Sequence, residues 1–221
     1  MQTEDIVSKL SSIKTNYITN HLTGNTVLDV GSGYGYYSEW LLSQIPQLSI
    51  TAIDQLELIP HKGINFLSAN LEQPIPLPNN SFSTVLAFDI IEHISNEELF
   101  IKELYRICQP HGVIIGSVPH DDDKFLPRYN LTFRHRSDLT HKRYYTKKTL
   151  QEALEQSGFH IVQIQGHGEI QPQCFAEFFP KPLHFLVKKI IGAMRRLHLI
   201  DTKKLASDLF FVAQKTENQR H

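Results

Sequence analysis

The glycine-rich segment at residues 27–35, Val-Leu-Asp-Val-Gly-Ser-Gly-Tyr-Gly, has the spacing of a loop that holds a ligand. It follows an apolar run typical of a strand and precedes a helical pattern, which is the setting such a loop requires. Glycines allow the tight turn and let the backbone approach a ligand closely, because they carry no side chain. Asp29 is placed to bind nearby backbone or, through water, a ligand ammonium group. The residues of this segment that we expect at a ligand are Asp29, Gly31, Ser32, Gly33 and Gly35.

Asp54 ends the next apolar run, nineteen residues after Gly35. An acidic side chain at this place accepts hydrogen bonds from both hydroxyls of a ribose, so it predicts a nucleoside ligand without saying which one. A dinucleotide fingerprint G-x-G-x-x-G would need glycine at position 36, where this chain has Tyr36. The glycine spacing therefore disfavours an NAD-dependent oxidoreductase.

A second group of chemically active residues lies in segment 88–94, Phe-Asp-Ile-Ile-Glu-His-Ile, directly after another apolar run. Carboxylates and a histidine at the carboxyl end of a strand match the rule that open α/β sheets bind ligands at that edge. A neutral imidazole is available near neutral pH, so His93 is the best candidate for a general base. A purely structural role for His93 is the alternative.

The segment 119–148 is rich in His, Arg, Asp and Tyr and has no clear period, which predicts a long loop in the substrate region. Arginine and tyrosine there are suited to a phosphate, a carboxylate or sugar hydroxyls. The alternative is that most of these side chains are on the surface and that a tyrosine packs the loop onto the sheet. The adjacent acids 121–123 are expected to be solvated rather than to bind a metal. The candidates in this segment are His120, Asp121, Arg134, His135, His141, Arg143, Tyr144 and Tyr145, and those we single out for substrate contact are His120, His141, Arg143 and Tyr145.

The elements that must position these residues alternate between strand-like and helix-like segments, which predicts a parallel sheet covered by helices on both faces. Strands are expected at 26–30, 48–53, 64–67, 84–88, 113–118, 160–165 and 209–213. Helices are expected within 1–25 and at 36–44, 96–108, 150–157 and 183–199. Ser95 is placed to cap the helix at 96–108, with Leu99 on its apolar side, and Thr146 to cap the helix at 150–157.

The composition of the whole chain indicates one globular domain spanning 1–221, because 221 residues suffice for one core and are few for two. A net charge of -1 excludes a polycation that binds nucleic acid. No apolar run is long enough to span a bilayer, and the polar start is unlike a secretory signal. Cys108 and Cys174 form no metal or redox motif, so we expect a cytoplasmic location.

Four segments resemble motifs of one enzyme family. Asp-x-Gly-x-Gly-x-Gly at 29–35 resembles motif I of the Rossmann-like methyltransferases, and 70–82 is similar to their adenine-contacting stretch with its proline-rich loop. Segment 88–94 is similar to their Asp-x-x-Glu-His signature, and 141–146 to their H-x-R-x-[FY]-[ST] segment. From about 26 to 159 the chain therefore resembles the type-11, small-molecule group of class I S-adenosylmethionine-dependent methyltransferases.

The resemblance implies an enzyme that uses S-adenosylmethionine. It also implies an α/β fold: a Rossmann-like, seven-stranded, mostly parallel sheet with an antiparallel last strand. Asn70 and Ser83 stand where the family usually has aspartates, although Asn70 can still bind an adenine edge. The further cofactor-binding residues that it implies are Asp54, Asn70, Leu71, Phe88 and Asp89, and the catalytic ones are Glu92 and His93.

The acceptor that we expect is a small molecule, or a lipid- or glycan-linked one, methylated on oxygen or nitrogen, with no nucleic-acid partner and no metal. Two alternatives stay open. Quinone-biosynthesis O-methyltransferases have a similar Glu-His string, which leaves a metal at Asp89, Glu92 and His93 as one of them. A non-catalytic nucleoside-binding module is the other.

The insertion at 181–204 carries a basic amphipathic helix. At about 100° per residue its cations and its apolar residues fall on opposite sides. The cations are Lys188, Lys189, Arg195 and Arg196, and the apolar residues are Leu183, Leu186, Ile190, Met194 and Leu197. One interpretation packs the apolar side onto the domain. The other places the helix at an anionic membrane surface, which would make the protein peripheral at the inner membrane near a lipid-carried acceptor.

Overall fold

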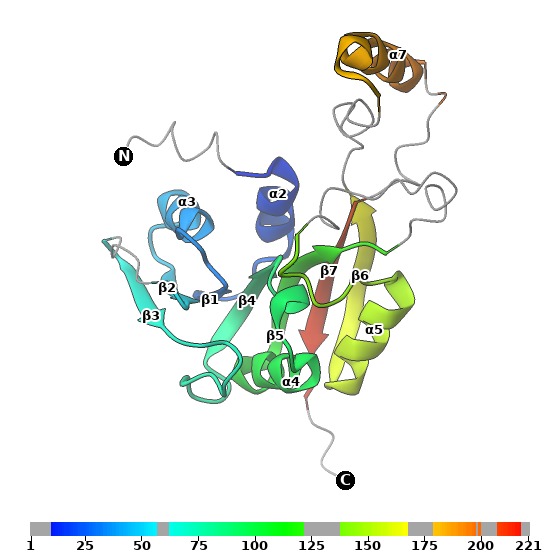
Figure 1. Cartoon of the computed structure of the whole chain (residues 1–221). Helices are drawn as coiled ribbons and strands as arrows, with labels where there is room; N and C mark the ends of the chain where they lie inside the picture. Colours follow the sequence, from blue (N-terminus) through cyan, green and yellow to red (C-terminus); the bar gives the residue numbers. More distant parts are fainter. Residues whose placement is uncertain are drawn as a thin grey trace.

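Seven strands form one sheet in the order β3-β2-β1-β4-β5-β7-β6 (Figure 1). The structure, a computed structural model, describes residues 10–56, 62–121, 138–167, 179–197, 199 and 207–217. Strand β7 is antiparallel to both of its neighbours, and the other six strands run parallel to one another. The predicted mostly parallel sheet with an antiparallel last strand is therefore confirmed.

The elements alternate along the chain as the sequence pattern predicts. The strands are β1 (Thr26–Val30), β2 (Ser49–Asp54), β3 (Ile64–Ser68), β4 (Phe82–Phe88), β5 (Cys108–Pro119), β6 (Phe159–His167) and β7 (Asp208–Lys215). The helices are α2 (Ser12–His21), α3 (Tyr36–Gln44), α4 (Glu97–Ile107), α5 (Lys147–Gln156) and α7 (His184–Arg196), with short 3-10 turns η1 (Ile91–His93) and η4 (Lys181–Leu183).

The two faces of the sheet carry separate apolar clusters, because successive residues of a strand point to opposite sides. In β4, Val85 packs in the cluster that α4 and α5 complete, whereas its neighbour Leu86 packs in the cluster of α2 and α3. Figure 1 shows these two helix pairs on either side of the strands. Burial on both faces explains why every residue of the central strand β4 is buried, whereas the edge strands β3 and β6 also carry exposed residues.

Three details of α4 and β5 differ from the sequence expectation. Asn96, not Ser95, caps α4, since the Asn96 side chain accepts the Leu99 amide at 3.1 Å. Ser95 is instead bound through its amide and hydroxyl to Glu72. Leu99 lies on the outer side of α4 and is 40% exposed. Strand β5 starts at Cys108 rather than 113, because Cys108 pairs with Phe82 before a register shift.

The sheet reverses its strand order between β1 and β4, which makes their carboxyl ends a topological switch point. Strand β6 ends and β7 begins at this same edge, since Pro119 and His167 both pair with Asp208. In the part of the chain that the structure describes, no helix has the length and apolar character to cross a membrane.

Candidate active site

A cavity of about 620 Å³ opens at the switch point, at the carboxyl ends of the parallel strands. Its walls come from the turns after β1, β2, β3 and β4 and from the segment before α5. The predicted residues that line it are Gly31, Asp54, Asn70, Leu71, Asp89 and His93. Residues from four separate turns thus meet at one place, as the rule for open α/β sheets leads one to expect.

The glycine loop is held to the end of β2 by its backbone. The amides of Gly31 and Ser32 donate to the Ile53 carbonyl, and the Gly33 amide donates to the Asp54 carboxylate at 2.8 Å. Gly31 and Gly33 both have positive φ, a conformation that favours glycine. A Cβ on Gly31 would lie 2.7 Å from the Ile90 side chain, while a Cβ on Gly33 would meet no atom within 4 Å. The loop is therefore fixed in shape, with open space over Gly33.

Asp54 shapes the loop as well as lining the cavity. One carboxylate oxygen accepts the Gly33 amide and the other accepts the Leu56 amide at 3.0 Å. The hydroxyl of Ser32 is buried and has no hydrogen-bond partner among the residues that the structure describes. Gly35 caps α3 in the left-handed conformation, so the loop leads directly into that helix.

Asp29 and Phe88 lie behind the cavity wall rather than in it. Asp29 is buried and accepts a hydrogen bond from the Ser38 hydroxyl at 2.7 Å, which ties β1 to α3. Burial raises the pKa of Asp29 to about 6, although the bond from Ser38 opposes that shift. Phe88 packs in the apolar cluster under α2 and α3. Both residues support the loop from inside the domain.

Asp89, just after β4, is held by two side chains. Its carboxylate accepts a hydrogen bond from the Ser117 hydroxyl and forms an ion pair with Lys14 of α2. Burial alone would lower the pKa of Lys14, but the charge and hydrogen bond of Asp89 outweigh it and raise that pKa. Lys14 was missed in the sequence because a single lysine 75 residues from its partner gives no signal.

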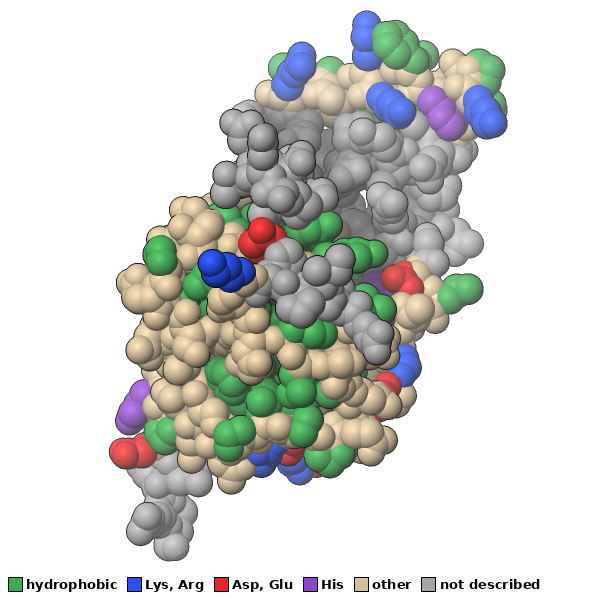
Figure 2. Space-filling model, turned by 90° about the vertical axis from the view of Figure 1, so that its left-hand side faces the viewer, with side chains coloured by type: hydrophobic (Ala, Val, Ile, Leu, Met, Phe, Trp, Pro, Cys, Tyr) green, Lys and Arg blue, Asp and Glu red, His purple; other side chains and the backbone are tan. Residues whose placement is uncertain are grey.

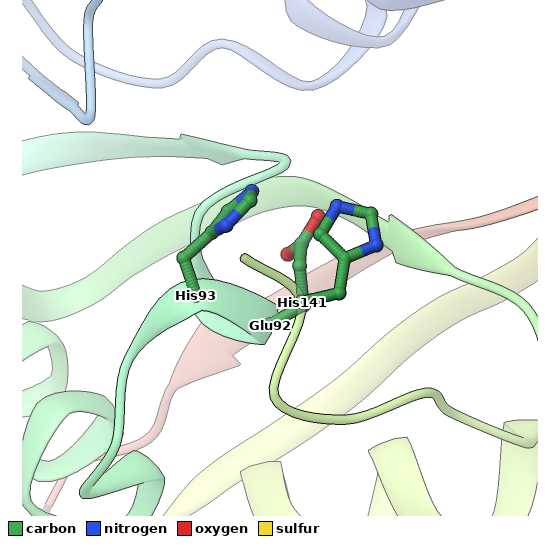
Figure 3. A group of neighbouring side chains, drawn as sticks. All are labelled: Glu92, His93 and His141. Atoms are coloured by element: carbon green, nitrogen blue, oxygen red, sulfur yellow. The ribbon is translucent and has the colours of Figure 1, made fainter. Parts of the chain in front are cut away.

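Glu92, His93 and His141 form a cluster beside η1, and Figure 3 shows their side chains turned toward a shared space. Of the three, only His93 lines the cavity. One ligand atom from each lies within 4.8 Å of the others. Glu92 is fully buried, and neither of its carboxyl oxygens has a hydrogen-bond partner in the described residues. Burial, and then the charge of Asp89, raise the pKa of Glu92 to about 8. Asp89 is not part of this cluster.

His93 is oriented by a short hydrogen-bonded chain. Its Nδ1 lies 2.9 Å from the Thr140 hydroxyl, which donates to the Asp138 carboxylate at 2.6 Å. Because Thr140 gives its proton to Asp138, its oxygen accepts from Nδ1–H, and this leaves Nε2 as the unprotonated nitrogen. Burial, and then the neighbouring His141, lower the pKa of His93. The imidazole is therefore neutral at neutral pH.

Arg143 and Tyr145 hold the turn that carries Glu92 and His93. The Arg143 guanidinium donates to the carbonyls of Ile94 at 2.5 Å and Ser95 at 2.9 Å. The buried Tyr145 hydroxyl donates to Glu97 in the first turn of α4 at 2.5 Å. Neither side chain lines the cavity. Their contacts favour a role in positioning η1 and the start of α4 over contact with substrate.

The structure describes some, but not all, of the remaining candidates from segment 119–148. His120 is buried at the end of β5, where its amide donates to the Ser207 carbonyl, and it does not line the cavity. The Tyr144 ring stacks edge-on to His141 at 6.0 Å. Arg134, His135 and the acids 122–123 lie outside the described residues. Leu139, Thr140 and Lys142 do line the cavity and were not predicted. Leu139 and Thr140 belong to no motif, and Lys142 occupies an unspecified position of the motif at 141–146.

Comparison with known proteins decides the family. Residues 4–164 match a family model described as a methyltransferase domain. The chain belongs to this family. A Mycolicibacterium smegmatis protein named "probable S-adenosylmethionine-dependent methyltransferase" is 26% identical over 162 residues, which are 68% of this chain and 59% of that protein. A Rickettsia prowazekii ubiquinone biosynthesis O-methyltransferase is 26% identical over 71% of this chain and 66% of its own length. The chain thus spans about three fifths to two thirds of these curated relatives.

Solved structures support the fold of this methyltransferase. An S-adenosylmethionine-dependent methyltransferase from Archaeoglobus fulgidus superposes with a TM-score of 0.65 at 20% identity, covering 96% of this chain and 95% of that one. The Burkholderia thailandensis 1,6-didemethyltoxoflavin-N1-methyltransferase, solved with S-adenosylhomocysteine, gives 0.57 at 16% identity over 97% and 80% of the two chains. The prediction that the chain belongs to the S-adenosylmethionine-dependent methyltransferases, rather than to the NAD-dependent oxidoreductases, is confirmed by the family match.

Proposed function

We propose that the cavity at the switch point binds S-adenosylmethionine along Gly31, Asp54 and Asn70, and that this methyltransferase methylates a hydroxyl oxygen of a small molecule held beside His93. One observation carries the proposal: the cofactor candidates and His93 line the same cavity of about 620 Å³. That volume lies in the range of small-molecule sites. An amine acceptor methylated on nitrogen is the alternative.

The cofactor side of the cavity suits a nucleoside. Asp54 places a partly exposed carboxyl group at the cavity wall, where ribose hydroxyls can donate to it. The open space over Gly33 lets a ligand approach the backbone. The buried Ser32 hydroxyl, with no partner in the described part of the chain, would gain one from the ligand.

When bound, S-adenosylmethionine supplies a methyl group on a positive sulfur, which makes that carbon electrophilic. The chain's own task is to place the acceptor oxygen behind this carbon and to remove its proton. The Asp138–Thr140–His93 chain leaves Nε2 of a neutral imidazole as the proton acceptor. The pKa of the buried Glu92 beside it is about 8, and the positive charge that His93 gains would lower that pKa and favour the ionised carboxylate.

The second part of the proposal concerns the chemical class of the acceptor. Curated relatives are named ubiquinone biosynthesis O-methyltransferases. This supports an aromatic hydroxyl, free or lipid-linked. A glycan-linked hydroxyl would need the same base. A lipid-linked acceptor would bring the enzyme to the inner membrane surface.

The test measures S-adenosylhomocysteine formed from S-adenosylmethionine with a panel of catechols, quinols, sugars and amines. Replacement His93→Ala should lower kcat by on the order of 100-fold or more, the usual contribution of a general base, and leave cofactor affinity within about twofold. The wild-type rate should rise with pH to a plateau, with a midpoint below 6.5, the ordinary histidine value. A flat profile with an active alanine variant, or turnover of amines alone, would contradict the proposal.

A metal-assisted O-methyltransferase is the second candidate, favoured by the Glu92–His93–His141 cluster. A buried carboxylate without partners and two imidazoles fit the donor set of a divalent cation. When bound, such an ion would acidify the acceptor hydroxyl. The Asp138–Thr140 pair would then serve as the outer hydrogen-bond partner that orients His93.

Calorimetric titration of the EDTA-treated protein with Mn²⁺ separates the two candidates without measuring activity. Saturable binding that Glu92→Gln and His141→Ala abolish, with turnover restored by the ion, would favour the metal. Undiminished turnover in EDTA and no saturable binding would favour His93 as a base on its own.

A further inference from the structure

Helix α7 projects from the domain with its apolar side uncovered. It lies in the insertion between β6 and β7, and Figure 1 shows it apart from the sheet and from the other helices. Its five apolar residues on the predicted face are 36% to 67% exposed: Leu183, Leu186, Ile190, Met194 and Leu197. In the described residues, this apolar side is therefore exposed and does not pack onto the domain.

The same helix is strongly basic. From 178 to 200 the sequence has no aspartate or glutamate, and its cations are Lys181, Lys188, Lys189, Arg195 and Arg196. Lys188, Lys189 and Arg196 are exposed, and the Lys189 ammonium lies 4.6 Å from the centre of the Phe185 ring. Figure 2 shows Lys and Arg side chains beside hydrophobic ones along the projecting helix. A positive helix with an uncovered apolar side has the composition of an interfacial membrane anchor.

We propose that α7 docks in the plane of an anionic membrane, with its apolar side at the boundary of headgroups and acyl chains and its cations among the phosphates. The length suits this orientation, because thirteen residues are too few to span a bilayer but enough to lie along its surface. Burial of the apolar side supplies a non-electrostatic part of the binding, and the cations select anionic lipid.

Charge decides between a membrane and a second copy of this chain. Two copies joined along the apolar sides of α7 would leave both sets of cations on the outer faces of the pair, with no acid on either helix to compensate them. An anionic bilayer instead compensates all of them. The membrane is therefore the better occupant, and self-association becomes an outcome of the test.

Docking would also orient the enzyme. Strand β6 ends and β7 begins at the carboxyl edge of the sheet, so the insertion that carries α7 leaves the domain at the edge that holds the cavity. A helix anchored in the bilayer would turn this edge toward the membrane. This consequence rests on the proposed function, whereas membrane docking itself does not.

The experiment is sedimentation of the full chain with vesicles of phosphatidylcholine alone or of equal parts phosphatidylcholine and phosphatidylglycerol. Glutamine replaces each changed residue because it keeps helix propensity. The charge variant is Lys188→Gln, Lys189→Gln and Arg196→Gln, and its matched control is Lys102→Gln, Lys147→Gln and Lys148→Gln, three exposed lysines elsewhere. The apolar variant is Leu186→Gln, Ile190→Gln and Leu197→Gln, and its control is Leu99→Gln and Val162→Gln.

The wild type should sediment with anionic vesicles and not with neutral ones, and salt should release it. Each basic residue near such a surface strengthens binding by roughly fivefold, so the charge variant should bind on the order of 100-fold more weakly. The apolar variant should also lose binding, and both controls should bind like the wild type. An unchanged circular dichroism spectrum and an unchanged urea-unfolding midpoint of every variant show that each remains folded.

Three results would overturn the proposal. They are equal binding to neutral and anionic vesicles, equal losses in the charge variant and its lysine control, or no binding to any vesicle. If sedimentation velocity instead shows a concentration-dependent dimer that the apolar variant abolishes, α7 is an interface between copies of this chain. Since no arm measures methyl transfer, failure here is distinguishable from failure of the proposed function.

Discussion

Glu92 holds a carboxyl group where ionisation is costly. Its pKa is about 8 in the folded protein, against an ordinary value of 4.5. A carboxyl with a raised pKa binds its proton more tightly in the folded state than in the unfolded state. The free energy of unfolding should therefore decrease as the pH rises from about 4.5 to about 8. A buried ionisable residue at a functional site commonly lowers the free energy of unfolding and is kept for its role in function.

The variant Glu92→Gln should remove this dependence. In EDTA, the difference in free energy of unfolding between variant and wild type should shift in favour of the variant by on the order of 3–5 kcal/mol between low and high pH. Urea unfolding at several pH values measures it. Asp29 and Asp208 also have raised pKa values and remain in both proteins, so their effects cancel. Parallel stability curves would show that Glu92 is ionised in the folded protein.

Replacement of Gly33 should weaken ligand binding more than it destabilises the fold. A methyl group there meets nothing within 4 Å, so Gly33→Ala should lose only the roughly 1 kcal/mol that a left-handed φ costs alanine. The same methyl occupies the space over the loop and should weaken S-adenosylhomocysteine binding by at least tenfold, measured by calorimetry. The control is Gly192→Ala in α7, which also has open space. Wild-type affinity in Gly33→Ala would show that the cofactor does not bind over this loop.

At the scale of elements, the segment before α5 positions the base. Replacement Thr140→Val keeps the shape of the side chain and removes the hydroxyl that lies between His93 and Asp138. We expect kcat to fall by roughly 10- to 100-fold, since the imidazole loses its fixed tautomer, with a change in the pH profile and unchanged cofactor affinity. Thr140→Ser should restore most of the rate. A valine variant with wild-type kcat and pH profile would show that the hydroxyl plays no part.

Local sequence patterns predicted the elements better than their ends. The helix at 36–44 and the strand at 26–30 are confirmed to the residue, because a glycine loop joins and delimits them. Thr146 caps α5 as predicted, and Thr149 completes the reciprocal capping pair. Ser95 failed as a cap because Glu72, distant in sequence, binds its amide and hydroxyl. Caps depend on such tertiary partners, which periodicity does not reveal.

At the scale of the whole molecule, the site is an assembly that the sequence predicted only in part. The glycine loop, Asp54 and His93 follow strands, so their meeting at one edge could be predicted. The approach of His141 to Glu92 could not, because a long loop separates them. The same holds for Lys14 and Asp89, which belong to distant segments. Arg143 and Tyr145 were predicted at the substrate but bind the turn at η1 and the start of α4.

The central claim is that the cavity at the switch point is the cofactor site, and calorimetric titration with S-adenosylhomocysteine tests it most directly. The wild type should bind one equivalent, and NAD should not compete. Asp54→Ala should weaken binding by on the order of 1.5–3 kcal/mol, the range for hydrogen bonds to a charged group. The control Asp138→Ala removes a carboxylate outside the cavity wall and should bind like the wild type. A folded Asp54→Ala variant with wild-type affinity would contradict the account.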